Sequence, residues 1–142
     1  MKNTIRLSTA TALILGASLI FASAHEFLIK DVLIVHPRVN IDQQARTAEG
    51  YLYLENTGNH TVRLISASSP HAERVNIRQR AGSDGQSITS VDLPPGGGAE
   101  FVPGGSILLF SGLHDLPGGD EMLPVTLTFE SAGDLKIGFM ME

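Results

Sequence analysis

Five histidines and no cysteine limit the metal chemistry open to this chain of 142 residues. Without a thiolate, a metal must be held by imidazole, thioether, carboxylate or backbone groups. One histidine has an unusual position, because His25 directly follows the small-residue triplet Ala22-Ser23-Ala24. A triplet of this kind is typical of a signal-peptidase cleavage site. His25 is therefore a candidate for the first residue of an exported protein.

The segment before His25 has the layout of a signal peptide. Lys2 and Arg6 give it a positive start, and residues 9–21 form an uncharged apolar run. A membrane-spanning helix needs about 20 apolar residues, so this run is too short to span comfortably. We expect residues 1–24 to be a cleaved signal peptide, residues 25–142 to form one domain, and the mature chain to have no membrane span.

The charge balance excludes one class of partner. Cleavage after Ala24 removes two of the ten basic residues and none of the fifteen acidic ones, which leaves a net charge of −7. Nucleic acids attract basic surfaces, so no nucleic-acid partner is expected. An acidic chain is compatible with handling a cation, although acidity is more commonly a means of staying soluble.

A free amino terminus would give His25 two nitrogen donors. The α-amino group and the imidazole have ordinary pKa values of about 7.7–8.0 and 6.5, so a metal competes readily with protons near neutral pH. One imidazole from elsewhere would complete a T-shaped site of three nitrogens, a histidine brace. Nitrogen sites of tetragonal geometry favour Cu(II). We therefore expect copper, as Cu(II) rather than Cu(I), at His25.

The third nitrogen depends on how residues 27–35 fold. In one straight strand, His36 would lie roughly 35 Å from His25. If Lys30-Asp31 forms a turn, Ile29 faces Val32 and His25 faces His36, with Cβ atoms about 5 Å apart. The pair Lys-Asp lacks the glycine that two-residue turns favour. The hairpin is the expected structure, and both alternatives remain open at this point.

The other candidate ligands have simpler interpretations. His114 lies in a loop rich in glycine and proline and is the reserve ligand if His36 is not used. His60 and His71 are expected at the surface. The methionines Met122, Met140 and Met141 are interpreted as packing or chain-end residues rather than as thioether ligands.

The elements that must position these residues are strands. Short apolar runs at residues 51–55, 62–65, 99–102, 107–110, 125–129 and 135–140 are separated by turns containing Gly, Pro or Asn. No segment has a sustained helical period. This pattern predicts an all-β fold, an antiparallel Greek-key sandwich, with strands over 50–56 and 124–130.

Four segments carry a resemblance to a known family. They are GYLYLENTG at 50–58, ASSPHAERV at 67–75, PGG at 103–105 and LPVTLTF at 123–129, and His36-Pro37 precedes them. In this order they resemble the PCuAC family of bacterial periplasmic copper chaperones. The resemblance implies a cupredoxin-like sandwich, a periplasmic location and a role in copper homeostasis. Arg38 stands where many members have tryptophan.

The family's copper ligands are not present at the matching positions. Members bind Cu(I) through two histidines and two methionines, and the residues that match them here are Arg78, Thr89, Ile107 and Leu109. A guanidinium and apolar side chains cannot replace soft thioether ligands. We therefore expect much weaker Cu(I) binding than the resemblance alone implies.

Two functions follow from these observations. We expect a non-enzymatic periplasmic copper-binding protein, a chaperone or store, in which His25 and His36 hold Cu(II). A copper-dependent oxidase or monooxygenase is the candidate recipient. The alternative is a metal-free sandwich that assists assembly of a copper enzyme or respiratory complex. A polymer-oxidising brace enzyme is disfavoured, because it needs an aromatic surface and the chain has no tryptophan.

Overall fold

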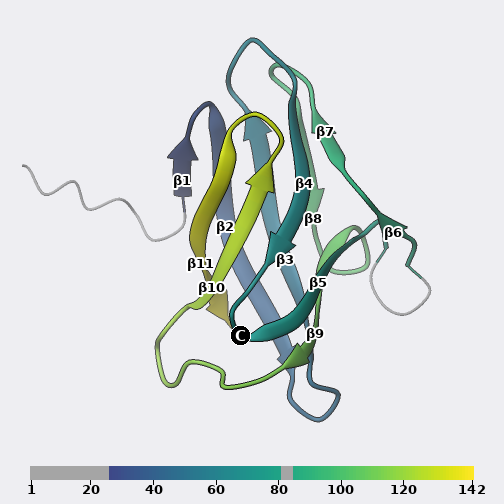
Figure 1. The fold of residues 1–142 in the computed structure, drawn as a ribbon, viewed down its shortest axis with the longest axis vertical. Coiled ribbons are helices and arrows are strands. Elements are labelled where there is room, and N and C mark those ends of the chain that lie inside the picture. Colours follow the sequence, from purple (N-terminus) through teal and green to yellow (C-terminus); the bar gives the residue numbers. More distant parts are fainter. Residues whose placement is uncertain (1–25, 81–84) are drawn as a thin grey trace, which may run out of the picture.

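The computed structural model describes residues 26–80 and 85–142, and every regular element in these residues is a strand (Figure 1). The eleven strands are β1 (Glu26–Ile29), β2 (Val32–Asp42), β3 (Thr47–Asn56), β4 (Val62–Ser68), β5 (Ala72–Arg78), β6 (Ser87–Ile88), β7 (Val91–Leu93), β8 (Gly98–Phe101), β9 (Ile107–Leu113), β10 (Leu123–Phe129) and β11 (Gly133–Met141).

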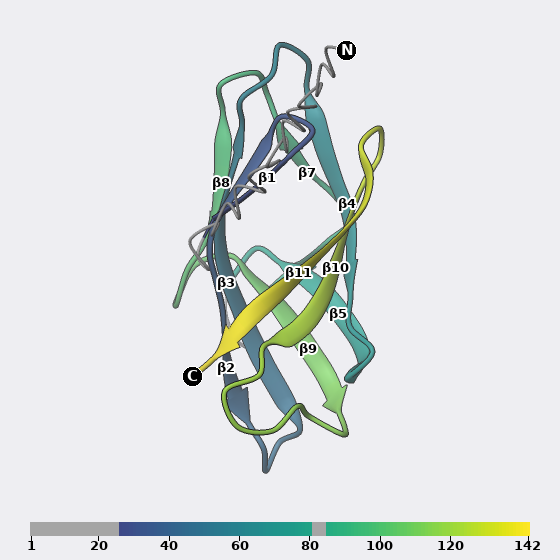
Figure 2. The same cartoon turned by 90° about the vertical axis from the view of Figure 1, so that its left-hand side faces the viewer.

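The strands form two layers around one core (Figure 2). One layer contains β2, β3 and β8, and the other contains β4, β10 and β11. The hydrogen-bonded order β6-β5-β9-β3-β2-β11-β10-β4-β7 runs continuously through both layers, with β1 on β2 and β8 on β3. All strand pairs are antiparallel except β11 with β2. The predicted all-β, cupredoxin-like sandwich is confirmed.

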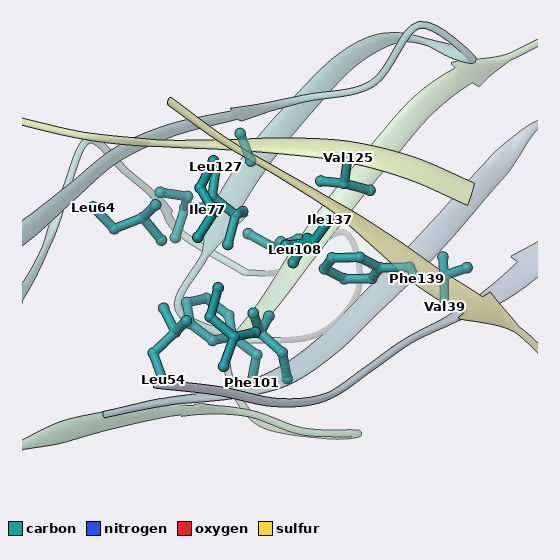
Figure 3. Packing of buried hydrophobic residues seen from close by; sticks show 14 of the residues in the cluster. Val39, Leu54, Leu64, Ile77, Phe101, Leu108, Val125, Leu127, Ile137 and Phe139 are labelled. Atoms are coloured by element: carbon teal, nitrogen blue, oxygen red, sulfur yellow. The ribbon is translucent and has the colours of Figure 1, made fainter. Parts of the chain in front are cut away.

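The core follows from period-2 alternation along the strands. In β10 the buried side chains alternate with outward ones, and β11 repeats this pattern. Apolar side chains from both layers meet in the interior (Figure 3). The rings of Phe110 and Phe139 pack there edge to face with centroids 6.2 Å apart. Gly50 makes room for this pair, since a Cβ there would lie 2.8 Å from Cε2 of Phe110.

The predicted strands agree closely with the observed ones. β3 covers all of residues 50–56, while β10 ends at Phe129, so Glu130 falls in the turn that follows. The short strands β5, β6 and β7 were not predicted from the pattern of apolar runs. β5 carries mainly polar residues, and only Ile77 is fully buried in it.

Candidate metal site

The hairpin predicted at Lys30-Asp31 is present. β1 pairs with β2 in the register Ile29 with Val32 through Glu26 with Val35. The straight-strand alternative is therefore wrong. Val32 and Ile34 are buried in the core, as expected for the inward face. His25 lies outside the described residues.

Contacts from the rest of the fold hold a turn that has no glycine. Lys30 and Asp31 have φ angles of 46° and 70°, as in a type I′ turn. The carbonyl of Asp31 accepts hydrogen bonds from the backbone N–H of Thr57 at 2.7 Å and from its hydroxyl at 3.1 Å. Lys30 Nζ donates to the carbonyl of Ala132 at 3.0 Å. Gly58 lies so close that a Cβ there would be 2.9 Å from Cβ of Asp31.

His36 stands at a β-bulge in β2. The register with β3 shifts between Val35, opposite Tyr53, and Arg38, opposite Tyr51. His36 has a φ of 51° and an exposed side chain, and histidine is among the non-glycine residues that adopt this left-handed conformation more often. Bulges are frequent next to functional sites because they redirect a side chain.

Two strands share the edge of β2 on either side of this bulge. β1 pairs with residues 32–35, and β11 pairs in parallel with Arg38 and Val39 through Met140 and Met141. Both strands lie alongside β2 in Figures 1 and 2. The first residues of β1 and the last residues of β11 thus lie on either side of His36 along the same edge of β2.

A groove of about 420 Å³ surrounds His36. It is mainly apolar, and three of its side chains are large and unusually exposed, namely Tyr53, Val102 and Met140. Sequence reasoning missed Met140 as a neighbour of His36. The alternation of side chains in the last strand could have indicated this position, because an inward Phe139 requires that Met140 point outward.

Arg38 and Glu142 form an ion pair at the groove. The Arg38 guanidinium lies 5.4 Å from the centroid of the Tyr51 ring and 3.7 Å from a carboxylate oxygen of Glu142. The Tyr51 hydroxyl donates a hydrogen bond of 2.7 Å to Glu49. Burial, this hydrogen bond and the charge of Glu49 raise the pKa of Tyr51 to about 12. Tyr51 therefore stays neutral at physiological pH and is a donor, not an anionic ligand.

The reserve ligand His114 lies in a different hollow, which Gln43 and Arg46 also line. Its backbone N–H donates to the carbonyl of His71 at 3.0 Å, and its Nδ1 lies 3.1 Å from the carbonyl oxygen of Gly112. The structure places His114 beside His71 and does not place it in the groove of His36. His60, as expected, is exposed.

The positions that match the family's ligands lie elsewhere. Arg78 pairs with Ile107 across β5 and β9, and Ile107 is completely buried. The Arg78 guanidinium donates to the carbonyl of Gly85. Leu109 faces Asn76 on the same pair of strands. These positions provide no imidazole or thioether.

In the described part of the chain, no three or more side chains of the types His, Asp and Glu gather closely enough to hold a metal ion. No helix in residues 26–80 and 85–142 is long and apolar enough to cross a membrane. A nitrogen site at the groove thus needs a donor beyond His36, and the residue next to β1 is the candidate.

Comparison with solved structures defines the class of domain. The copper-bound PCuAC domain from PmoF2 is similar with a TM-score of 0.73 and 24% identity, covering 83% of this chain and 97% of that domain. The apo PCuAC domain from PmoF1 gives 0.74 and 22%, covering 83% and 98%. The solution structure of CuI-DR1885 from Deinococcus radiodurans gives 0.63 and 15%, covering 84% and 81%. The chain has the PCuAC fold, which confirms the resemblance.

A family model matches most of the sequence. The chain belongs to the LpqE-like family, described as "Putative lipoprotein LpqE-like", which matches residues 29–141. No curated protein matches the chain.

Proposed function

We propose that this chain is a non-enzymatic copper-binding protein of the periplasm that holds Cu(II) for delivery or storage. The ligands are the α-amino group and imidazole of His25 and the imidazole of His36. Two similar structures support copper as the cargo, since the PCuAC domain from PmoF2 is copper-bound and DR1885 was solved with Cu(I).

The observation that carries the proposal is the register of the first hairpin. Glu26 pairs with Val35, and continuing this register by one residue on each strand would bring His25 opposite His36. Directly opposed residues have Cβ atoms about 4.5–5.5 Å apart, a suitable separation for two imidazoles on one metal. The bulge exposes the His36 side chain at this point.

Processing supplies the third nitrogen. Cleavage after Ala24 frees the amino group of His25, which then chelates together with its own imidazole. A residue left in front of His25 would turn the amine into an amide. The lipoprotein description of the family supports export of the chain.

The preference for Cu(II) rests on the kind of donor. Three nitrogens in tetragonal geometry suit Cu(II), whereas Cu(I) prefers soft thioether or thiolate ligands. Arg78 and Ile107 occupy positions where the family resemblance implies Cu(I) ligands, so that site is not expected to act here.

A second candidate function is supported by the groove itself. Tyr53, Val102 and Met140 expose 36%, 42% and 39% of their surface around His36. A metal-free sandwich could use this apolar groove to bind a protein during assembly of a copper enzyme or respiratory complex. Copper-dependent oxidases and monooxygenases are the candidate recipients in either case.

The test uses protein that begins at His25, with Cu(II) binding followed by calorimetry and electron paramagnetic resonance. We expect one Cu(II) per chain with a nitrogen-rich tetragonal spectrum. His25→Ala, or an added alanine before His25, should abolish or severely weaken binding. His36→Asn removes the imidazole while asparagine still accepts the positive φ at this position. His60→Asn, in an exposed loop, is the matched control and should bind normally.

The pH dependence provides an independent check. Binding should fall between about pH 7 and 5, because protons compete for the amine and the imidazoles. Equal binding by the alanine-extended protein and by His36→Asn would refute the nitrogen site and favour the partner-binding function. Loss of binding in a His114→Asn variant, with His36→Asn normal, would move the third ligand to His114.

A further inference from the structure

Two methionines lie on the outer face of the sandwich, at one end of the ladder between β10 and β11. This ladder ends where Leu123 pairs with Phe139, and Met122 and Met140 are the chain neighbours of that last pair. Leu123 and Phe139 are fully buried. Because side chains alternate, both methionines point outward on the same face.

Their exposure is unusual for packing residues. Met122 is 37% exposed and Met140 is 39% exposed, whereas Met141, the next residue in the strand, is partly buried against the core. The core therefore does not account for the positions of the two outward thioethers.

Gly138 leaves room for the side chain of Met122 on this outer face. Met122 crosses diagonally to Gly138, where an ideal Cβ would lie 2.7 Å from Sδ of Met122. Only a residue without Cβ permits this close approach. Met140 is two residues further along the same face, a distance of about 6.6 Å along the strand. The flexible side chain of methionine can span a gap of this size.

We propose that Met122 and Met140 form a binding site for Cu(I) that is separate from the nitrogen site. Thioethers are soft ligands that select Cu(I), and they need not lose a proton to bind it. Two protein ligands make a weak, rapidly exchanging site, in agreement with the absence of the family's ligand set. This inference goes beyond the proposed function, because it uses none of the same donor atoms.

The proposed thioether site lies next to the proposed nitrogen site. Met140 lines the groove that contains His36, and Met140 pairs with Arg38 just beyond the bulge. Met140 thus lies about one strand spacing, roughly 4.8 Å, from the strand that carries His36.

Nuclear magnetic resonance of methionine methyl groups tests this site directly. Mature protein with ¹³C-methyl methionine is titrated with Ag(I), a redox-stable ion that shares the soft character of Cu(I), in chloride-free buffer. We expect the methyl signals of Met122 and Met140 to shift together and saturate at one ion per chain. The signal of Met141 should not move.

Substitutions with leucine keep the apolar volume while removing the sulfur. Met122→Leu and Met140→Leu should each lower the affinity for Ag(I), and for Cu(I) in competition with a chromophoric chelator, by about tenfold or more. Met141→Leu is the matched control and should stay within about twofold. Equal effects of all three substitutions, or no shift at Met122 and Met140, would overturn the proposal.

Protein with an alanine before His25 separates this inference from the nitrogen site. It should keep Ag(I) binding even though the proposed Cu(II) site is blocked. If the extension, or His36→Asn, abolishes Ag(I) binding while all methionines are intact, the soft ion is held by nitrogen donors and the thioether site is wrong. If Cu(II) binding fails in every variant but Ag(I) shifts persist, only the nitrogen site is refuted.

Discussion

The side chain of Asn56 ties the loop after β3 to the end of β7, next to the Thr57 that contacts the first hairpin, and its removal gives the sharpest test of the fold. Its side chain is completely buried. The amide nitrogen donates to the carbonyls of His60 at 2.6 Å and Leu93 at 2.9 Å, while its oxygen accepts from the N–H of Gly58 at 3.0 Å. Asn56→Ala removes three hydrogen bonds, each with a net value of about 0.5–1.5 kcal/mol.

The expected loss in the free energy of unfolding is therefore about 2–4 kcal/mol, measured by urea denaturation with fluorescence or circular dichroism. The exposed neighbour Asn59 provides the control, because Asn59→Ala should change stability by less than about 0.5 kcal/mol. The N–H of Thr57, which bonds Asp31 at 2.7 Å, should exchange faster with solvent in the Asn56 variant. A loss below about 1 kcal/mol would show that water replaces these bonds and that the loop is not held as argued.

Three further predictions concern other parts of the sandwich. Gly50→Ala should lower the free energy of unfolding in urea by about 1–3 kcal/mol, because the added Cβ would lie 2.8 Å from Cε2 of Phe110. An unchanged urea midpoint would show that the core relaxes freely around the added methyl group. Ultraviolet titration should find the Tyr51 phenol ionising near pH 12, and Glu49→Gln should lower that pKa; titration near 10 would contradict the buried donor. The hydrogen bond from Arg63 lowers the pKa of Asp92 from its ordinary value of 3.8, so the pair stabilises the fold above that pH and the stabilisation is lost as the pH falls through the folded pKa. The stability difference between wild type and Asp92→Asn, small because both groups are exposed, should therefore shrink as the pH is lowered below 3.8; a difference that stays constant there would contradict the pair.

The hairpin could be predicted from sequence because the alternation of apolar residues sets the register. Val32 and Ile34 had to face the core, and a two-residue turn then fixed which residues of the first strand lay opposite them. The turn itself was the doubtful feature, since it has no glycine and requires a positive φ at Lys30 as well as at Asp31. Its stabilisation comes from Thr57, about 26 residues away in the chain, and local sequence carries no signal for such a contact.

The bulge and the groove could not be read from the sequence. The position of His36 depends on an extra residue in β2 relative to β3, which reflects pairing between strands rather than any property of His36-Pro37 alone. The position of Met122 and Met140 beside the last pair of the β10–β11 ladder likewise required the register of these strands. Methionine is adaptable and apolar, so its residue type favours packing until its exposure is known.

The division of one strand edge explains how a small sandwich without cysteine can present two kinds of metal donor. β1 and β11 both pair with the same edge of β2, and the bulge at His36 lies between the two paired segments. The end of β11 brings the thioether of Met140 to this point, and the proposed function would bring the nitrogen donors of His25 there from the amino end of β1. Because the proposed nitrogen site needs a free amino group and the thioethers do not, cleavage after Ala24 would change Cu(II) binding while leaving the soft-ion site unaltered.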